Sequence, residues 1–483
     1  MFNSNKAPLV LVWVMISVSG VSHAATLEDA LVRAYQTNPG LQVQREKLRA
    51  IDEGYVQAKA EFAPTVSLQV QTDYERERLG LEGRHNAQLS STPIPDYYEQ
   101  NSVSGQLVFS QPLYSSGRFA ADVKAADANV RAGRAALRTA EANLLFSVIQ
   151  AYVGLQRDED ALQIRTANLA MLKHQVDETV ARQRAGEVTR TDVSQAEAQL
   201  ASEQALYAAA QGQIDISRAS YLALVGGSDD TVAPPPDLIG LPTTLDAAMT
   251  AAERDNPDLQ QAVFNEQSSK AKVYAARANG KMVVSAQLRA GYDGSLVPYD
   301  GRDLNHDLSL TTNVVIPLYS GGMQTSQVKQ ALDENSADQF NIDDVHRHVI
   351  QNVSIAWRQM LIAQAGLEAQ ERQVAAAKIA FEGMRKEYSN GDRSTLDVLV
   401  AEETLRDAEL SVASSRHDLY LSKALILQNM GWLELENLVS TPIIYDPTRN
   451  LAKRSTATEG VADALRHLDN TALPDIHPIR LTH

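Results

Sequence analysis

Two periods of alternating hydrophobic and polar residues run along this chain of 483 residues. The shorter period, of two residues, covers 65–74 and 102–109, and it returns at 282–292 and 307–316. Such alternation predicts β-strands with one apolar and one polar face. The pattern therefore predicts four strands in all, which are too few to form a closed β-barrel by themselves.

The longer period is a heptad that follows each pair of predicted strands. Apolar residues recur at every seventh position there, and this spacing predicts helices that pack together as coiled coils. An ordinary globular core stripe is the alternative. However, we expect each helix beside a turn to run for roughly 40 residues, well beyond the ~11 residues of an average globular helix. The stripes consist of Val148, Leu155, Leu162, Leu169 and Val176, and of Val353, Met360, Leu367, Val374 and Phe381.

The chain also resembles itself. TLEDALVRAYQTNPGLQ at 26–42 matches TLDAAMTAAERDNPDLQ at 244–260, and QPLYSSG at 111–117 matches IPLYSGG at 316–322. Self-similarity of this kind indicates a tandem duplication, in which each copy holds a helix, two strands and a long helical hairpin. We expect the polar C-terminal tail to be poorly ordered. The predicted division is a signal peptide (1–24), a first repeat (25–225), a proline-rich linker (226–243), a second repeat (244–439) and the tail (440–483).

One short pattern appears in both copies, as RAGEVTRTDV and as SNGDRSTLDV. We interpret each as the turn where a long helix reverses, because Gly186 and Gly391 can adopt the left-handed backbone geometry that ends a helix. Asp192 and Asp397 then fall in the opening turns of the next helix, where the helix dipole favours a negative charge. A role as helix-start residues and nothing more is the simpler interpretation of both aspartates.

The amino terminus and the charge restrict where the chain works. Residues 1–24 combine one lysine, an apolar run and small residues near the end, which together predict a secretory signal peptide. A membrane anchor is the alternative, but the apolar run is short of the ~20 residues that span a bilayer. The formal net charge of -16 argues against nucleic acid as a partner, because phosphates attract Lys and Arg. The absence of cysteine excludes a lipid-modified N-terminal Cys.

The sequence predicts no catalytic, cofactor or metal site. Acidic and hydroxyl residues form no nucleophile–base pattern, and we find no phosphate-binding loop and no zinc-ligand spacing. His346 and His348 suggest a metal site at first sight. Residues two apart on a helix do not face each other, however, and no third ligand is visible. We therefore predict that the protein is not an enzyme and holds no cofactor.

Together these features resemble the TolC family of outer-membrane export channels. The resemblance rests on the signal peptide, the duplicated unit, TLEDALVRAYQTNP, the PLYSSG and PLYSGG pair, and YSNGDRSTLDVL, and it covers residues 26–439. It implies an α+β membrane protein that works as a homotrimer. Each subunit would lend four strands to one shared barrel among the lipids of the outer membrane. The helices would continue as an α-helical coiled-coil barrel across the periplasm.

The resemblance also implies a gate at the periplasmic end, where polar links join inner and outer helical hairpins. Asp192 and Tyr388 match the positions of one link, and Gln175 and Arg393 match those of another. The chemistry suits both links, because Tyr388 can donate to a carboxylate and Arg393 can donate to an amide oxygen. Each bond contributes about 0.5–1.5 kcal/mol, so a docking partner can break several of them.

An acidic ring at the constriction is a further implication of the resemblance. Asp397 matches one ring-forming position, and threefold symmetry would bring three of its carboxylates together. The second ring position, three residues on, holds Val400 instead of an acid. We therefore expect weaker cation selectivity than the family pattern implies.

Three hypotheses for function follow. The first is a passive duct for type I protein secretion, powered by an inner-membrane transporter of the ABC or RND type and joined to it by a periplasmic adaptor protein. The second is efflux of small molecules, including drugs, through the same duct. The third is a periplasmic coiled-coil scaffold that conducts nothing. Recovery in the outer-membrane fraction as a heat-modifiable trimer would separate the first two from the third.

Overall fold

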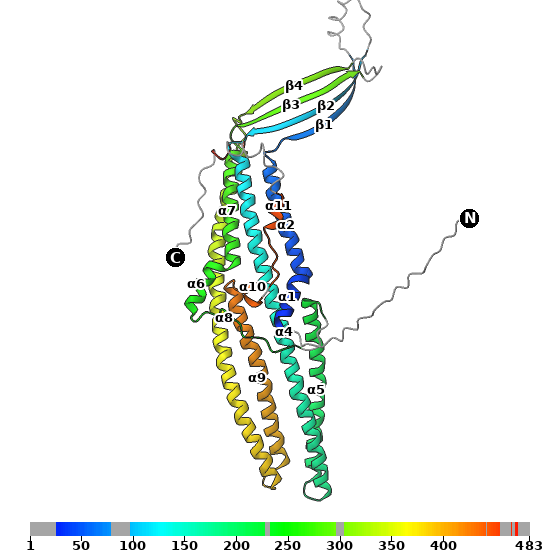
Figure 1. The fold of residues 1–483 in the computed structure, drawn as a ribbon, viewed down its shortest axis with the longest axis vertical. Helices are drawn as coiled ribbons and strands as arrows, with labels where there is room; N and C mark the ends of the chain where they lie inside the picture. Colours follow the sequence, from blue (N-terminus) through cyan, green and yellow to red (C-terminus); the bar gives the residue numbers. More distant parts are fainter. Residues whose placement is uncertain are drawn as a thin grey trace, which may run out of the picture.

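The computed structural model shows a rod of helices with a β-sheet at one end (Figure 1). The predicted signal peptide lies outside the described residues, and so does most of the chain after residue 454. The described ranges are 26–78, 97–227, 232–295, 304–440, 442–454, 465 and 469–471.

Each half of the chain begins with two short helices whose boundary is set by an Asn-Pro pair. Asn38 caps the second helix of the first half by accepting a hydrogen bond from the Leu41 N–H. Asn256 accepts from the Leu259 N–H in the second half. Proline fits the next position because the first helical N–H has no partner within the helix. The helices are α1 (Leu27–Thr37), α2 (Pro39–Ala60), α6 (Leu245–Asp255) and α7 (Pro257–Ala278).

The predicted strands form one antiparallel sheet in the order β1-β2-β3-β4, which confirms the interpretation of the period of two. The central pairing of β2 with β3 joins the two halves of the chain, and it places Gln106 opposite Gly291. One irregularity in this pairing falls between Pro112 and Tyr114. The strands are β1 (Thr65–Glu77), β2 (Tyr98–Tyr114), β3 (Val283–Ser295) and β4 (Asn305–Val315).

Four long helices make the rod. α4 (Arg118–Arg184) and α8 (Met323–Ser389) each have 67 residues. They exceed the expected length of roughly 40 residues because they continue unbroken from the sheet to the far end, for about 100 Å. α5 (Arg190–Val225) and α9 (Thr395–Asn429) return from that end. Of the helices in the described ranges, none combines the length and the apolar character that crossing a bilayer requires.

The largest core cluster lies midway along the rod, where α4 meets α1, α2, α5 and α9. Val148 and Leu155 of the first heptad stripe are fully buried there, and Val353 of the second stripe is buried in a neighbouring cluster. Towards the far end the stripes become partly exposed, as at Phe381. Two short helices, α10 (Leu435–Leu438) and α11 (Arg449–Arg454), follow α9, and α11 lies against α2.

The described part of the C-terminal tail packs against the rod, so the expectation of a poorly ordered tail is wrong for these residues. Arg45 of α2 lies between two tyrosine rings, with its guanidinium carbon 4.5 Å from the centre of Tyr35 and 4.7 Å from that of Tyr445. Farther on, the buried Asp469 accepts hydrogen bonds from the N–H and the hydroxyl of Ser115, at 2.9 and 2.8 Å. The negative charge of Asp469 is favourable there because α4 begins three residues after Ser115, and the dipole of a helix favours a negative charge at its N-terminus.

Candidate functional site

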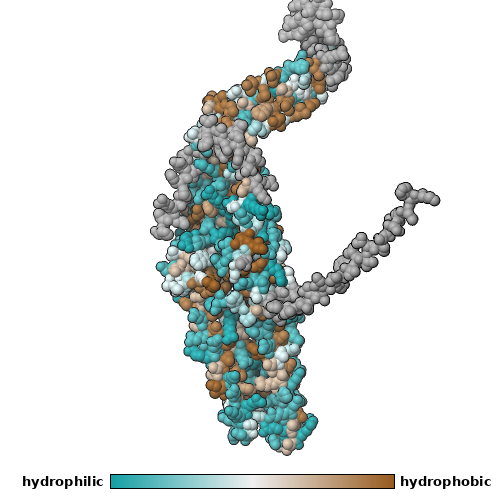
Figure 2. All heavy atoms as spheres, in the orientation of Figure 1, coloured by the Kyte–Doolittle hydropathy of each residue, from teal (hydrophilic) through white to brown (hydrophobic). Residues whose placement is uncertain are grey.

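The sheet has one apolar face and one polar face. Val66 lies opposite Phe109 on the apolar face, whereas Gln69 lies opposite Gln106 on the polar one. Apolar side chains cover much of the sheet surface seen in Figure 2, and Leu68 is 70 % exposed. A continuous apolar surface marks contact with another protein or with a membrane. Its exposed side chains include Val66, Leu68, Val70, Leu107, Phe109, Leu288, Leu308, Leu310 and Val314.

The apolar face has the height of a bilayer core. Along β1 its positions run from Val66 to Tyr74. At about 3.4 Å per residue this stretch spans about 27 Å, close to the ~25 Å apolar band of outer-membrane proteins. Tyr74 and Tyr292 are exposed towards the end of the sheet that lies away from the helices. Tyrosine favours the interface between lipid and water, so this face suits contact with a membrane.

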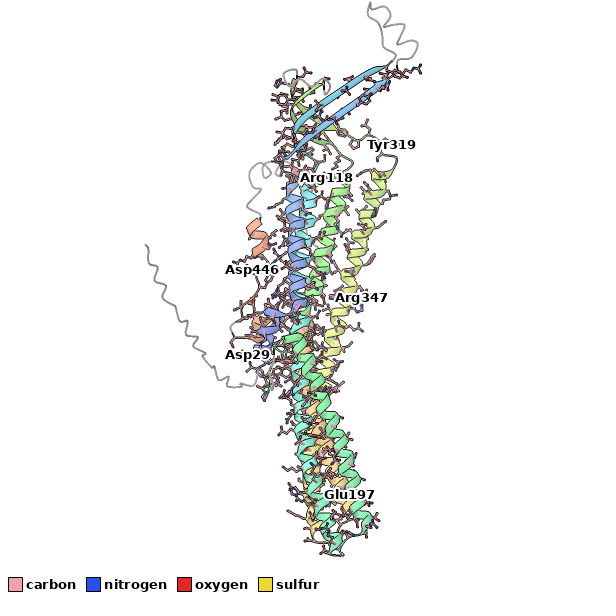
Figure 3. The ribbon with its side chains drawn as sticks, turned by 90° about the vertical axis from the view of Figure 1, so that its right-hand side faces the viewer. Asp29, Arg118, Glu197, Tyr319, Arg347 and Asp446 are labelled. Atoms are coloured by element: carbon pink, nitrogen blue, oxygen red, sulfur yellow. The ribbon has the colours of Figure 1, made fainter. Side chains whose placement is uncertain are left out.

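At the opposite end of the molecule each long hairpin reverses in a short turn, and we call residues 185–189 and 390–394 the tips. Gly186 and Gly391 lie in the tips with φ angles of 82° and 86°. No neighbouring atom would obstruct a side chain at either position. The backbone angle is therefore the reason for glycine, since left-handed geometry is unfavourable for other residues. The two tips lie side by side in Figure 1, and Figure 3 labels Glu197 on α5 a short way above them.

The aspartates that follow the two tips, Asp192 and Asp397, each complete a capping box. Asp192 Oδ2 accepts from the backbone N–H and the hydroxyl of Thr189, both at 2.7 Å. Asp397 Oδ2 accepts from the same groups of Ser394, at 3.0 and 2.8 Å. These hydrogen bonds lower the pKa of both carboxyl groups, so both are ionised at neutral pH. The signal for this role is present in the sequence as the Thr-x-x-Asp and Ser-x-x-Asp spacing.

The two links implied by the resemblance are not formed within this single chain. Among the described residues, no hydrogen bond joins Asp192 to Tyr388, or Gln175 to Arg393. Arg393 Nε instead donates to Glu387 at 2.8 Å, and the buried amide nitrogen of Gln175 has no hydrogen-bond partner. The roles of these residues in a gate stay predictions.

A contact that sequence reasoning missed joins the two hairpins near the tips. The guanidinium of Arg182, in the last turn of α4, lies over the ring of Tyr388 in the last turn of α8. The Tyr388 ring is buried, and its hydroxyl accepts a weak hydrogen bond from Thr395 at 3.4 Å. Arg182 also pairs with Glu187 at 3.1 Å. A basic residue at a helix end is expected from the helix dipole alone, so Arg182 carries no sequence pattern that indicates a contact with Tyr388.

A second missed feature is an ion cluster between the hairpins, farther from the tips. Glu203 of α5 is 1 % exposed and accepts from Arg165 of α4 at 3.3 Å. Its other oxygen accepts from Arg406 of α9 at 3.1 Å. Buried charges require such partners, because an unpaired charge in the interior is costly. The cluster therefore fixes the position of one hairpin relative to the other.

Asp397 also lines a small hollow between α8 and α9. The hollow has a volume of about 350 Å³, and Leu396 and Val400 form part of its wall. Val400 is 54 % exposed, so an apolar side chain faces solvent one helical turn from the carboxylate. At position 400 the structure therefore presents an apolar surface where the family pattern has a second acidic residue.

Comparison with known proteins shows the family to which this chain belongs. The family model described as outer membrane efflux protein matches residues 30–227 and 249–431. The chain belongs to this outer membrane efflux protein family. Its members are channels rather than enzymes. The protein is therefore an outer-membrane channel protein that extends into the periplasm, as the TolC resemblance implied.

Similar proteins within the outer membrane efflux family cover most of this chain. The outer membrane efflux protein BepC of Brucella suis is 30 % identical, and the alignment covers 87 % of this chain and 89 % of BepC. Outer membrane protein TolC of Escherichia coli is 23 % identical, with 94 % of each chain covered. The alkaline protease secretion protein AprF of Pseudomonas aeruginosa is 24 % identical, with 66 % of this chain and 68 % of AprF covered.

The fold agrees with solved structures of outer-membrane channels. The CmeC channel of Campylobacter jejuni superposes with a TM-score of 0.75 at 13 % identity, covering 94 % of this chain and 97 % of CmeC. The outer-membrane channel OprN superposes with a TM-score of 0.72 at 20 % identity, covering 84 % of this chain and 90 % of OprN. At these identities the likeness concerns the fold alone.

Proposed function

We propose that three copies of this chain form one continuous export duct through the outer membrane and the periplasm. The observation that carries the proposal is a sheet with one apolar and one polar face, joined directly to helices of 67 residues. Three such sheets would supply about twelve strands, within the range of about 8–26 found in outer-membrane barrels. Closure would also pair the free edges of β1 and β4 with neighbouring subunits.

In this assembly the polar face of the sheet lines the channel and the apolar face contacts lipid. The helices need neighbours as well, because α8 carries large apolar side chains that are exposed in the single chain. Phe340, Ile362 and Ile379 are each more than 70 % exposed. Ile355 and Ile362 are one heptad apart, which is the spacing of a coiled-coil contact. Neighbouring subunits would cover this surface and complete an α-helical tunnel.

The tips would form the periplasmic gate. Three ionised Asp397 side chains around the symmetry axis would attract cations, and the Asp192–Tyr388 and Gln175–Arg393 links would hold the hairpins closed. In the Gln175–Arg393 link the guanidinium would donate to the amide oxygen, because arginine has no acceptor. Individual hydrogen bonds of about 1 kcal/mol are weak enough for a docking partner to break. An adaptor protein bound to an inner-membrane ABC or RND transporter is that partner in this proposal.

Two cargo classes fit such a duct. Type I protein secretion is the function that the sequence motifs favour, and the similarity to AprF, which is named for secretion of alkaline protease, supports it. Efflux of small molecules is the second candidate, and the higher identity to BepC, which is named an efflux protein, supports that function.

Native mass spectrometry of the protein extracted from outer membranes tests the assembly. The proposal expects a complex with three times the mass of the mature chain, which dissociates to monomers only on heating. Recovery of a monomer from the soluble periplasmic fraction would instead support the coiled-coil scaffold.

A comparison of culture media tests the cargo. Mass spectrometry of medium from a deletion strain and from its complemented parent should show the loss of one or a few large proteins if the duct serves type I secretion. An unchanged medium, together with increased sensitivity of the deletion strain to antibiotics and dyes, would assign the duct to small-molecule efflux.

A further inference from the structure

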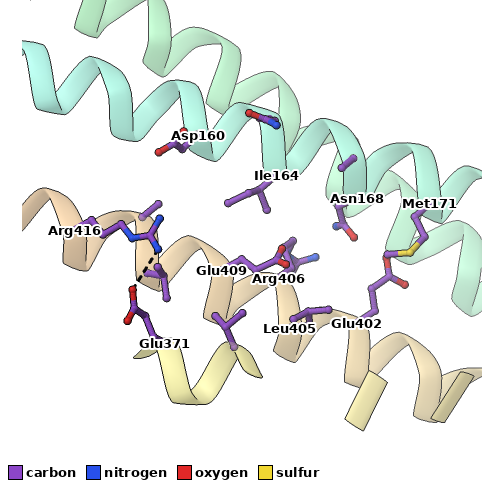
Figure 4. Close-up of a pocket in the computed structure, with 15 residues that line it drawn as sticks. Asp160, Ile164, Asn168, Met171, Glu371, Glu402, Leu405, Arg406, Glu409 and Arg416 are labelled. Carbon is purple, nitrogen blue, oxygen red and sulfur yellow. Dashed lines mark hydrogen bonds and ion pairs between the residues drawn. The ribbon is translucent and has the colours of Figure 1, made fainter. Parts of the chain in front are cut away.

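A cavity of about 680 Å³ lies between α4 and the hairpin of α8 and α9 (Figure 4). Its walls come from the stretch of α4 around Asn168 and from the stretch of α9 around Arg406. It is separate from the hollow at Asp397 and shares no lining residue with it. None of the predicted gate and ring residues lines this cavity.

Three buried polar atoms around this cavity have no hydrogen-bond partner. They are Oε1 of Glu402, Nδ2 of Asn168 and Nε of Arg406. Glu402 is 4 % exposed and Asn168 is 5 % exposed, so protein atoms cover most of each side chain. In folded proteins, buried polar groups usually have partners, and each exception calls for an explanation. Figure 4 shows Glu402 and Asn168 on facing helices, both directed into the space between them.

The charges at the cavity are out of balance. Arg416 is occupied by Glu371 at 3.2 Å, and Arg406 by Glu203 and by Asp407. The acids that remain are Glu402 and Glu409 from α9 and Asp160 from α4, and none of the three has an ion pair within the described residues.

Burial raises the pKa of each of these three acids above its ordinary value. For Glu402 it raises the pKa to about 7, against the opposing effect of Arg406 on the same helix. Glu203 from α5 raises the pKa of Glu402 further, and Arg385 from α8 lowers it. From α4, the side chains of Asn168 and Asp160 line the same cavity. A positive group placed among the acids would stabilise their ionised forms.

Most of the remaining lining residues are apolar, and Gln163 of α4 is the polar exception. Ile164 and Met171 come from α4, Val374 comes from α8, and Leu405 and Val412 come from α9. A ligand that satisfies every wall therefore needs an apolar body, a positive N–H group for the carboxylates and an oxygen that can accept from the Asn168 amide. An anion does not fit, because both arginines already have carboxylate partners.

We propose that this cavity is a binding site for an amphiphilic organic cation, whose N–H group donates to the carboxylate of Glu402. The proposal depends on contacts within one chain, so it stands whether or not the protein secretes proteins, effluxes small molecules or conducts ions.

Binding of rhodamine 6G, measured by fluorescence polarisation on the full-length protein in lipid nanodiscs, tests the proposal. This dye keeps its positive charge from pH 6 to 8 and carries both N–H donors and oxygen acceptors. We expect saturable binding at pH 8 that Glu402→Gln weakens by about tenfold or more, because a charge-assisted hydrogen bond is lost. Glu197→Gln is the matched control, because Glu197 is an exposed residue of α5, and it should leave binding unchanged. Anionic fluorescein should not bind.

The pH dependence separates a direct contact from a general change in structure. With a Glu402 pKa of about 7, affinity should fall by up to about tenfold per pH unit below 7, because the carboxyl group must lose a proton to bind the cation. Glu402→Gln should remove this dependence while it retains the thermal unfolding temperature. Ala413→Phe, which fills part of the cavity, should weaken binding at every pH. Absence of saturable binding, or equal affinity and equal pH profiles in Glu402→Gln and the unmodified protein, would overturn the proposal.

Discussion

The guanidinium carbon of Arg182 lies 4.6 Å from the centre of the Tyr388 ring, and this contact joins the ends of the two longest helices. It connects the α4–α5 hairpin to the α8–α9 hairpin within the last turns of α4 and α8. Such a contact contributes about 0.5–1 kcal/mol at an exposed site and about 2 kcal/mol or more when desolvated. Arg182 is 23 % exposed, so we expect the contribution of this contact to lie between these two values.

Removal of this contact should loosen the periplasmic gate that we propose. We predict that Arg182→Gln raises the mean single-channel conductance in planar bilayers, since the charge over the Tyr388 ring is lost. Arg372→Gln, on an exposed pair in the same rod, should leave conductance unchanged. If Arg182→Gln and Arg372→Gln have the same conductance as the unmodified channel, the Arg182–Tyr388 contact has no part in gating.

The buried ion cluster should matter for stability. Glu203→Gln leaves Arg165 and Arg406 without their shared carboxylate, and we predict a loss of about 3 kcal/mol in the free energy of unfolding. Denaturant unfolding followed by circular dichroism measures this change.

The matched control for the ion cluster is Glu368→Gln. Glu368 forms an ion pair with Arg372, and the two side chains are 72 % and 74 % exposed. Loss of this pair should lower the free energy of unfolding by about 0.5 kcal/mol or less. Equal effects of Glu203→Gln and Glu368→Gln would show that the cluster contributes nothing specific.

The sequence predicted those parts of the fold that local patterns encode. Alternation of apolar and polar residues predicts the strands, and each Gly-to-Asp stretch predicts a turn. Both predictions succeed because strands and turns depend on residues within a few positions of one another in the sequence. Contacts between distant residues left no such pattern. Glu203 and Arg406 are 203 positions apart, and Ser115 and Asp469 are 354 apart. Each acid taken alone has the appearance of an ordinary surface residue, so only the folded chain shows its partner.

The Asp469 contact predicts a specific effect on the junction between sheet and helix. Asp469→Asn removes the negative charge at the start of α4 and one of the two acceptor oxygens. We expect thermal unfolding at a lower temperature, corresponding to a loss of about 1–2 kcal/mol. Asp446→Asn, at an exposed turn before α11, should change the unfolding temperature little. A stability of Asp469→Asn equal to that of Asp446→Asn would remove Asp469 from any structural role.

The pKa of Asp397 gives the sign of a pH effect on cation block. Hydrogen bonds from the backbone and side chain of Ser394 lower this pKa. When folding lowers the pKa of a carboxyl group, the ionised group stabilises the fold at pH values above its unfolded-state pKa. This stabilisation is lost as the pH falls through the folded-state pKa. These hydrogen bonds oppose protonation of Asp397, whereas repulsion among three carboxylates would favour it, so block by multivalent cations should be retained at neutral pH and lost on acidification.

Asp397→Asn should weaken that block at neutral pH, because the acidic ring that we propose would lose its charge. Asp392→Asn, in the tip of the same hairpin, is the control and should retain the block. Undiminished block in Asp397→Asn would place the cation site elsewhere in the channel.

Single-channel recording of the purified protein in planar lipid bilayers tests whether three chains form a conducting duct. We expect discrete, long-lived conductance steps that favour cations and that appear only with the trimeric fraction. Stable insertion of that fraction without discrete steps would show that the trimer is not a duct.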